Sequence, residues 1–600
     1  MREDTIPLMF FARANRYGNR CALRHKSGGR YRDISWSEFE GKVKDLAFGL
    51  ITLGLKPGEK VALLSENRPE WAYSDLAVLS LGCADVPLYP TDVPYQMEYI
   101  IRDSDSVIAI VSTAGQLDKI LSVSARLPSL RKIIVMDPDG RAKRPDIMSF
   151  ADLLEAGSAA AADARMDFES RLRSLKKEDL ASIVYTSGTT GQAKGVCLTH
   201  DNFLSNCRSS LDVLPFNEND VCLSFLPLSH VFERMAGYYF TLTIGGTIAY
   251  AENMESVGRN LKEVRPTYAC APPRFYEKLH AGIMEKASQG PPSKQKAFER
   301  ALNTAIEYAR AKLNNLEAGP ALWLKYHFAK IFIFRRINEA VGGRIRFFIS
   351  GSAPLSKELA EFFYSVGIFI FEGYGLTETS PVVTVNTFRA LRHGSVGRPI
   401  KDVEVKTASD GEILIKGPSV MKGYYKNEKA TAESIDPEGW LHTGDIGYFD
   451  ADGFLYITDR KKDIIITAGG KNIAPQNVEK LIKSDSYIQE VVVHGDRRPY
   501  LTALIVPDFN AMKGLALRLG IPYTSVPELI RHPRVQEYLW KRIEEKQNEL
   551  ANYEKIKKFR LLDRGLTIED GEITPTLKVK RRVVAEKYKE VFDEMYSSRG

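Results

Sequence analysis

Short apolar runs alternate with helical stretches through roughly the first 180 residues, and this alternation constrains the fold more than any other feature. Residues 60–90, KVALLSENRPEWAYSDLAVLSLGCADVPLYP, predict a strand, a helix and a second strand. SVIAIVST and KIIVMD predict two further buried strands, and a second run of the same kind extends from SIVYTSGTTG to APPRFYEKL. Because strands that alternate with helices favour parallel sheets covered by helices, we expect an α/β protein.

Length and charge predict how the chain is divided. Its 600 residues exceed what one hydrophobic core serves, so at ~150 residues per domain we expect several folding units. The net charge is +7, and the residues from Asp459 onward hold 27 Lys and Arg against 21 Asp and Glu. We predict a large N-terminal domain, 1–458, of mixed and parallel sheets with a smaller β-barrel-like region and a helical insertion at 281–340. A small mobile α+β domain, 459–600, is predicted to follow a hinge at 459–462.

Composition excludes several classes of protein. The six cysteines are scattered and form no CxxC pair, which excludes a zinc module or disulfide scaffold and fits a reducing compartment. The N-terminal segment lacks the apolar region of a signal peptide, and no apolar run approaches the ~18 residues of a membrane span. No nucleic-acid-binding motif accompanies the C-terminal charge, so we expect no nucleic acid partner. The chain is expected to be cytoplasmic, at most peripheral on the inner face of a membrane.

The excess positive charge after Asp459 leaves three interpretations open. It can attract an anionic ligand such as a nucleotide or coenzyme, face an acidic membrane, or form an ordinary solvated surface. Charge alone does not separate them.

The segment YTSGTTGQAKGV predicts a phosphate-binding loop. An apolar strand, Ala181–Tyr185, enters a loop of glycines and hydroxyls that contains one lysine. Glycines let backbone N–H groups face an anion, hydroxyls donate further hydrogen bonds, and lysine supplies a positive charge. The loop lacks Walker A spacing and is predicted to return into a second strand rather than a helix. The predicted binding residues are Thr186, Ser187, Gly188, Thr189, Thr190, Gly191 and Lys194.

With the motifs that follow it, this loop resembles the signature of the AMP-forming acyl-CoA synthetases, a branch of the adenylate-forming enzymes. GYGLTET is similar to the family's adenine and magnesium motif. The resemblance implies that Tyr374 stacks on adenine, Thr377 reaches the α-phosphate, and Glu378 ligates Mg²⁺ with Thr186 nearby. Such a donor set suits magnesium, which takes a few carboxylate or hydroxyl oxygens with phosphate and water. The sequence departs from the family at Ala193, where a proline usually precedes the lysine.

Two further motifs resemble the rest of the nucleotide site. GSAPLS, which begins at Gly351, is similar to a turn that lines the nucleotide and acyl sites. Glu372 and Gly373 would offer backbone contacts to adenine. In HTGDIG, Asp445 is implied to accept both ribose hydroxyls, although an aspartate on a turn is usually a turn or cap residue.

The C-terminal part carries the remaining implied groups. In DRKKD, Arg460 is implied to contact ribose, Lys462 to lie near the phosphates, and Asp459 to be the hinge residue. GEITPTLKVKR resembles the terminal motif whose lysine, here Lys578, is catalytic. A lysine in a basic tail, such as the neighbouring Lys580, is ordinarily solvated, so only the resemblance distinguishes Lys578.

The segment PLSHVFER carries His230. A lone histidine in an apolar stretch is more often a hydrogen-bonded core residue than a functional one. The resemblance implies instead that it orders the carboxylate site and the mouth of a fatty-acid channel. Where some long-chain members have a tryptophan gate, this chain has Arg234. The predicted catalytic residues are Lys578, Glu378, His230 and Lys194.

The resemblance implies a reaction in two steps. A carboxylate attacks the α-phosphorus of Mg·ATP to give acyl-AMP and pyrophosphate, and coenzyme A then displaces AMP to give a thioester. Lys578, Mg²⁺ and the phosphate loop would offset the negative charge that develops. Rotation about Asp459 would then withdraw Lys578 and bring the loop of Gly469, Gly470 and Lys471 towards the pantetheine tunnel.

The insertion and HVFER resemble long-chain fatty acyl-CoA synthetases, so the implied acid is a long-chain fatty acid. Residues 321–343 combine large apolar residues with four cations. We expect a packed core helix with a few exposed cations, the alternative being a helix at a membrane interface. Other functions share the motifs: an acyl-AMP ligase that loads a separate carrier protein, a catalytically silent nucleotide-binding sensor, and an oxygen-dependent luciferase.

Overall fold

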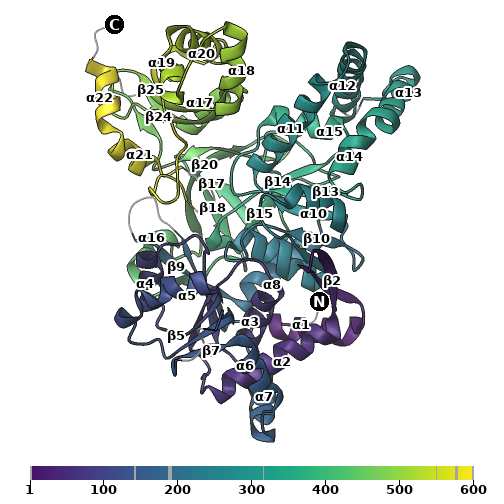
Figure 1. Ribbon diagram of the computed structural model, residues 1–600, viewed down its shortest axis with the longest axis vertical. Helices are drawn as coiled ribbons and strands as arrows, with labels where there is room; N and C mark the ends of the chain where they lie inside the picture. Colours follow the sequence, from purple (N-terminus) through teal and green to yellow (C-terminus); the bar gives the residue numbers. More distant parts are fainter. Residues whose placement is uncertain are drawn as a thin grey trace. The chain divides into compact units, whose positions relative to one another are not determined.

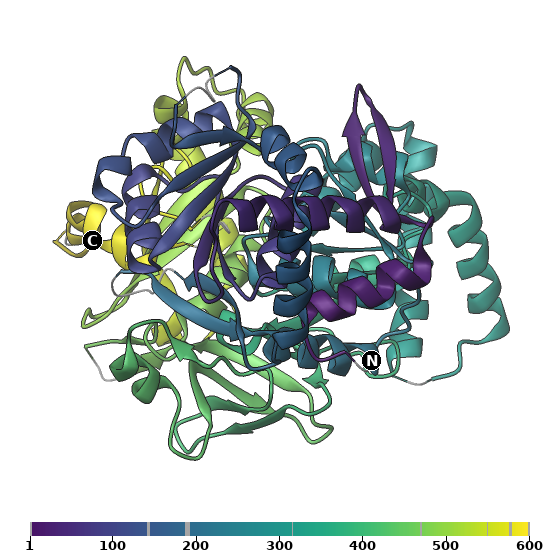
Figure 2. The same ribbon diagram turned by 90° about the horizontal axis from the view of Figure 1, so that it is seen from below.

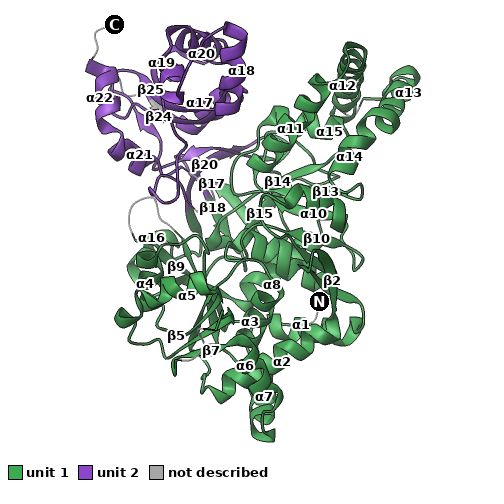
Figure 3. Cartoon of the chain, viewed as in Figure 1, with its two compact units in different colours: residues 1–406, 414–442, 450–455 green, residues 407–413, 443–449, 456–600 purple. Residues whose placement is uncertain are grey.

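A computed structural model describes residues 3–140, 144–186, 192–314, 316–468, 471–548, 550–574 and 579–597. The chain forms two compact units (Figure 3). The first comprises residues 1–406, 414–442 and 450–455, and the second comprises residues 407–413, 443–449 and 456–600. The hinge predicted at 459–462 stays a prediction.

An eight-stranded sheet of the first unit ends at the predicted phosphate loop. Its strand order is β19-β9-β8-β4-β3-β5-β6-β7. Neighbours from β8 to β7 run parallel, whereas β9 is antiparallel to both β8 and β19. The strands predicted at 60–64, 106–113 and 132–137 are thereby confirmed. The members are β3 (Lys60–Leu64), β4 (Ala84–Leu88), β5 (Ser106–Thr113), β6 (Lys132–Asp137), β7 (Ile147–Ser149), β8 (Leu180–Thr186), β9 (Lys194–Thr199) and β19 (Gly423–Tyr424).

A nine-stranded sheet forms the second large layer of this unit, in the order β16-β15-β14-β13-β12-β10-β11-β1-β2. Its central strands run parallel, and the antiparallel pairs lie at the two ends. The members are β1 (Cys21–Ser27), β2 (Arg30–Ser35), β10 (Val221–Ser224), β11 (Thr247–Tyr250), β12 (Tyr268–Ala271), β13 (Phe347–Ser350), β14 (Ile370–Gly375), β15 (Val382–Val385) and β16 (Arg398–Pro399).

Three smaller sheets follow along the chain. One has four strands in the order β17 (Glu404–Thr407), β18 (Glu412–Lys416), β20 (Leu441–Phe449) and β21 (Leu455–Arg460). A two-stranded sheet pairs β22 (Ile465–Ile466) with β23 (Asn472–Ile473). The third has β24 (Ile488–His494) antiparallel to β25 (Leu501–Pro507), and β25 parallel to β26 (Ile556–Leu561).

Local sequence accounts for many helix starts. At the start of α2, the Ser35 hydroxyl accepts from the Glu38 N–H, and the Glu38 carboxylate accepts from the Ser35 N–H, a capping box. Helices of the first unit are α1 (Ile6–Tyr17), α2 (Trp36–Thr52), α3 (Pro69–Ser80), α4 (Pro94–Asp103), α5 (Ala114–Leu121), α6 (Phe150–Ser158), α7 (Ala162–Ser174), α8 (His200–Leu211), α9 (Phe240–Ile244), α10 (Val257–Val264), α15 (Lys357–Ser365) and α16 (Glu428–Ser434), with a π-helix, η2 (Glu233–Tyr239). Helices of the second are α17 (Pro475–Lys483), α18 (Phe509–Leu519), α19 (Val526–Arg531), α20 (Pro533–Lys546), α21 (Arg581–Lys587) and α22 (Lys589–Ser597).

Residues 281–340 are largely helical and extend away from the sheets of the first unit (Figures 1 and 2). The prolines of QGPPS stand between the first two of these helices and begin the second. No helix within the described ranges is both long enough and apolar enough to cross a bilayer. The helices are α11 (Pro273–Ser288), α12 (Pro292–Leu313), α13 (Pro320–Ala329), the π-helix η3 (Lys330–Phe334) and α14 (Arg335–Ala340).

All six cysteines are free thiols. Five are buried, and only Cys21 is partly exposed. Burial raises the pKa of the Cys21 thiol to about 11 and that of Cys83 to about 12. Because the thiolate is the reactive form, these side chains are chemically inert at neutral pH.

Candidate active site

The ends of the predicted phosphate loop are held by a strand pair. In the antiparallel register of β8 and β9, Thr186 lies opposite Lys194 and Tyr185 lies opposite Gly195. A side chain at Gly195 would lie 2.7 Å from Ile183 Cγ2, so only glycine allows this close packing. The predicted return of the loop into a strand is confirmed. The loop residues Ser187, Gly188, Thr189, Thr190 and Gly191 lie outside the described residues.

Tyr424 joins the phosphate loop to the GYGLTET segment. Strand β19 pairs with β9, which places Tyr424 opposite Val196. The Tyr424 hydroxyl donates to Glu378 Oε1 over 2.9 Å, and Lys194 Nζ lies 4.8 Å from the centre of the Tyr424 ring. The backbone N–H of Met421 also donates to the Glu378 carbonyl over 2.8 Å. The structure thus brings together the predicted Lys194 and Glu378 through a tyrosine that no sequence motif marked.

GYGLTET lies where β14 ends, between β13 and β15. Tyr374 pairs with Thr384 of β15, and Thr377 and Glu378 follow in a short 3₁₀ turn. A side chain at Gly375 would lie 1.6 Å from the Pro381 carbonyl oxygen, so the motif's second glycine is required by packing. Ligands of parallel sheets bind at the carboxyl ends of strands, and this segment occupies such an end.

Glu372 ties this strand to the GSAPLS turn. Its side chain is 7% exposed, and Oε1 accepts from the Leu355 N–H over 2.9 Å. Its carbonyl accepts from the Asn386 N–H, and Gly373 pairs with Val385. Both predicted adenine-contacting positions are therefore built into the sheet backbone.

The PLSHVFER segment packs against the same turn. His230 Nδ1 accepts from the Phe232 N–H over 3.1 Å. A side chain at Gly351 would lie 3.2 Å from the Phe232 ring. The structure therefore brings the segments of His230 and Gly351 together, through Phe232.

Arg234 is enclosed in the core rather than placed at a channel mouth. Its side chain is 0% exposed, and its guanidinium bonds Asp75 Oδ1 at 2.5 Å and also the Asp85 carboxylate. It also donates to Ser182 Oγ over 2.9 Å and to the Tyr239 hydroxyl. Burial raises the pKa of Asp75 to about 7. Since Asp85 lies on β4 and Ser182 on β8, this network holds η2 against the sheet that ends at the phosphate loop.

Glu233, the residue before Arg234, is also 0% exposed. Neither carboxylate oxygen has a hydrogen-bond partner among the described residues. Burial raises the pKa of this carboxyl to about 8. A side chain at Gly237 would lie 2.4 Å from Glu233 Oε1, so glycine one turn later makes room for the carboxyl.

In the second unit, Asp445 and Arg460 form an ion pair. Arg460 Nε lies 3.0 Å from Asp445 Oδ1, and Asp445 is 5% exposed. Asp459 accepts from the backbone N–H groups of Arg460 and Gln476, and burial raises its pKa to about 6. The two residues expected at ribose are therefore in direct contact.

The other predicted lysines of this unit differ in their surroundings. Lys462 is exposed. Lys471 is also exposed, and its Nζ lies 5.7 Å from the centre of the Tyr553 ring. Gly469, Gly470 and Lys578 lie outside the described residues. The segment that contains Lys578 is bounded by a bridge between Ile573 and Val579.

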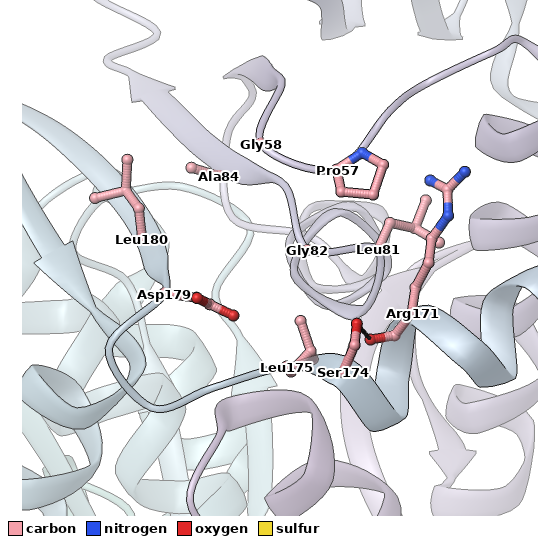
Figure 4. Close-up of a pocket in the computed structure, with 10 residues that line it drawn as sticks. All are labelled: Pro57, Gly58, Leu81, Gly82, Ala84, Arg171, Ser174, Leu175, Asp179 and Leu180. Carbon is pink, nitrogen blue, oxygen red and sulfur yellow. Dashed lines mark hydrogen bonds between the residues drawn. The ribbon is translucent and has the colours of Figure 1, made fainter.

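A cavity of about 280 Å³ lies where β4 and β8 begin, at the end of these strands opposite the predicted phosphate loop (Figure 4). Ala84 and Leu180, the first residues of β4 and β8, line it together with Arg171 and Asp179. Leu180 and Thr186 are the first and last of the seven residues of β8, and the distance between them corresponds to ~20 Å at ~3.3 Å per residue. The cavity is therefore separate from the candidate active site.

Comparison with known families identifies this arrangement. The family model described as AMP-binding enzyme matches residues 10–425, and that described as AMP-binding enzyme C-terminal domain matches residues 462–600. The chain belongs to the AMP-binding enzyme family. The family and the multi-domain α/β fold class predicted from the sequence are confirmed.

Relatives of this family member match nearly its whole length. Long-chain-fatty-acid–CoA ligase FadD15 of Mycobacterium bovis is 34% identical over 603 residues, covering 99% of this chain and 97% of that protein. Long-chain-fatty-acid–CoA ligase ACSBG2 of Xenopus laevis is 32% identical over 629 residues, covering 99% and 84%. Among solved structures, ATP-bound MatB from Rhodopseudomonas palustris has a TM-score of 0.71 at 24% identity, covering 98% of this chain and 99% of that one.

The donor set predicted for this AMP-binding enzyme is of the kind that suits magnesium rather than a metal held by protein alone. Among the described residues, no group of three or more His, Cys, Asp and Glu side chains could hold a metal ion. The two predicted donors, the Glu378 carboxylate and the Thr186 hydroxyl, would leave most coordination positions to phosphate and water, as magnesium prefers.

Proposed function

We propose that this chain activates a fatty acid, with long-chain acids as its substrates, in an ATP-dependent reaction. The acid and ATP give acyl-AMP and pyrophosphate, and coenzyme A then gives acyl-CoA and AMP. The observation that carries this proposal is the meeting of Lys194, Tyr424 and Glu378 beside the ends of the phosphate loop. The names of the Mycobacterium bovis and Xenopus laevis relatives support a long-chain fatty acid and coenzyme A as the substrates.

In the first step, residues of the first unit hold the triphosphate. Thr186, the loop 187–191 and Lys194 would bind the phosphates, while Thr377 would reach the α-phosphate. Bound Mg²⁺, held by Glu378 and Thr186, would offset negative charge on the phosphate oxygens. Removing one such preorganised contact costs about 3–4 kcal/mol, or ~10²–10³ in rate.

The remaining first-unit residues would place adenine and the acid. Tyr374 would stack on adenine, with the backbone of Glu372 and Gly373 along its edge. His230 and Gly351, which meet through Phe232, would border the acid carboxylate. Their contact supports this assignment, because it fixes the histidine segment against the turn.

The second unit would complete each half-reaction in turn. Asp445 and Arg460 would bind the ribose, and Lys462 and Lys578 would neutralise the phosphates. We propose domains 1–458 and 459–600, with rotation about Asp459 that replaces Lys578 by the loop of Gly469, Gly470 and Lys471. The hydrogen bond that Asp459 accepts from the Gln476 N–H supports its role at a hinge, since it ties β21 to the start of α17.

ATP–pyrophosphate exchange across acids from acetate to oleate tests the activity. We expect exchange with long-chain acids and thioester formation with coenzyme A. Transfer only to carrier protein would identify an acyl-AMP ligase, and no exchange with any acid would identify a nucleotide-binding sensor.

Lys578→Ala tests the catalytic lysine, with Lys580→Ala as its matched control two residues away. We expect Lys578→Ala to abolish exchange while it still forms thioester from supplied acyl-AMP, because the lysine acts only in the first step. Lys580→Ala should retain both steps. Equal loss of both half-reactions in Lys578→Ala would contradict the assignment.

We include the cellular location of the enzyme in this proposal. A cytoplasmic enzyme with water-insoluble substrates gains from peripheral association with the inner face of a membrane. The basic excess after Asp459 would also favour anionic coenzyme A, and a KM for coenzyme A that is independent of ionic strength would contradict that contribution.

A further inference from the structure

An apolar surface lies on α13 and η3, away from the candidate active site. Among the described residues, fifteen large hydrophobic side chains are exposed, and five of them fall between residues 323 and 332. We call this group the apolar patch: Trp323 (49% exposed), Leu324 (65%), Phe328 (61%), Ile331 (59%) and Phe332 (64%). Scattered exposed apolar residues are ordinary, but a contiguous group marks an interaction site.

The opposite face of the same helix is packed, and this packing holds the patch outward. Tyr326 stacks on Tyr308 of α12 with ring centres 4.0 Å apart, and Ala329 and Phe334 are buried in the core. That core cluster also contains Leu355, beside Glu372 of the candidate site. The expectation of a core helix with exposed cations is therefore correct for one face and wrong for the other. The large apolar side chains on the outer face need an apolar environment there as well.

Positive charge surrounds the apolar patch. Lys325, Lys330, Arg335 and Arg336 are all exposed, whereas Glu339 is the one acidic residue of 320–340 and pairs with Arg335. A second copy of the chain would place these cations against themselves in a symmetric interface, where like charges repel. An anionic lipid surface satisfies both features, because it takes apolar side chains at the acyl boundary and cations at the headgroups. Trp323 is the side chain most typical of that boundary.

We propose that the apolar patch docks on an anionic lipid bilayer, with α13 and η3 lying in the plane of the interface. This inference extends the proposed function and rests on it for the substrate. A fatty-acid ligase bound to a bilayer would take up its fatty acid from the lipid phase in which that acid dissolves. The docking surface itself is argued only from exposure, packing and charge.

Flotation with vesicles tests the proposal on the full chain. Vesicles of phosphatidylcholine alone are compared with vesicles that also contain phosphatidylglycerol, for wild type and for the triple variant Trp323→Ser, Phe328→Ser, Phe332→Ser. We expect wild type to bind the anionic vesicles preferentially and the triple variant to bind on the order of 100-fold more weakly. The matched control replaces isolated exposed residues elsewhere: Tyr95→Ser, Met166→Ser and Leu517→Ser, which are 70%, 64% and 85% exposed.

Thioester formation with oleate solubilised by a neutral detergent, in the absence of vesicles, separates this inference from the proposed function. If wild type forms no thioester but binds vesicles through the patch, the proposed function fails and the docking surface stands. If the triple variant binds vesicles as wild type does, or if wild type binds neither vesicle, the docking surface is wrong. A wild-type dimer that the triple variant loses, measured by sedimentation velocity, would show that a second copy covers the patch and would also overturn the proposal.

Discussion

We expect Arg234→Met to destabilise the first unit by about 4 kcal/mol at pH 7 and by much less at pH 5. Removing one partner of a buried ion pair costs about 3–5 kcal/mol, because the remaining charge has neither water nor a partner. The side chains of Arg234, Asp75 and Asp85 are between 0% and 1% exposed, so no solvent relieves this cost. Methionine fills a similar volume, which keeps the cavity contribution small.

The destabilisation depends on pH because protonation of a buried carboxyl neutralises the charge that has lost its partner. A carboxylate enclosed without its cation takes up a proton when the chain is folded. Protonating a carboxyl of ordinary pKa ~3.9 costs about 4 kcal/mol at pH 7 and about 1.5 kcal/mol at pH 5. The folded variant then binds more protons than folded wild type, in which Arg234 offsets the carboxylate charge, so its stability relative to wild type falls as pH rises.

Denaturant unfolding at pH 5 and pH 7, followed by tryptophan fluorescence, measures both values. Trp71 is fully buried, and its ring centre lies 5.3 Å from the Arg234 guanidinium, so it reports on this region directly. The triple variant Asp75→Asn, Asp85→Asn, Arg234→Met is the control and should recover most of the loss. A deficit below about 1 kcal/mol at pH 7, or the same deficit at both pH values, would refute the reasoning.

Two further substitutions test features of the candidate site. Burial raises the pKa of Glu233 to about 8, so as pH rises the unfolded chain releases this proton first and wild type loses stability relative to Glu233→Gln. The difference in unfolding free energy should grow between pH ~4.5 and ~8 by at most ~1.4 kcal/mol per pH unit, and a difference constant over that range would contradict the prediction. Tyr424→Phe removes the hydroxyl that donates to Glu378 over 2.9 Å. We expect ATP–pyrophosphate exchange to be ~10-fold slower and to need a higher Mg²⁺ concentration for saturation. Tyr425→Phe is the control. If the exchange rate depends on Mg²⁺ concentration in the same way for wild type and Tyr424→Phe, Tyr424 has no role in the site.

Much of the fold could be predicted because local sequence determines it. The buried strands β3, β5, β6 and β8 are short apolar runs bounded by turn residues, and their environment requires such runs. The loop after β8 returns into β9 because residues on either side of the glycines form a strand pair. The order of the motifs along the chain is specific enough to indicate the family from the amino-acid sequence alone.

Contacts between distant segments could not be predicted. Arg234 meets partners on α3, β4 and β8 that lie more than 50 residues away, and nothing near it in sequence marks it as buried. Tyr424 reaches Glu378 because the two residues of β19 pair with β9, and β19 is too short to give a periodic signal. For the apolar patch, the sequence favours a core helix and leaves an exposed helix at a membrane interface only as the alternative, since apolar composition predicts burial wherever no partner is known.

The protected state of the six native thiols makes this chain ready for site-directed labelling. A cysteine introduced at Tyr95 in the first unit and another at Leu517 in the second would be far more exposed than any native one. Both would ionise at their ordinary pKa, so maleimide dyes should attach to them selectively. Energy transfer between two such fluorophores would follow the separation of the units during turnover, one molecule at a time, without removing a single natural cysteine.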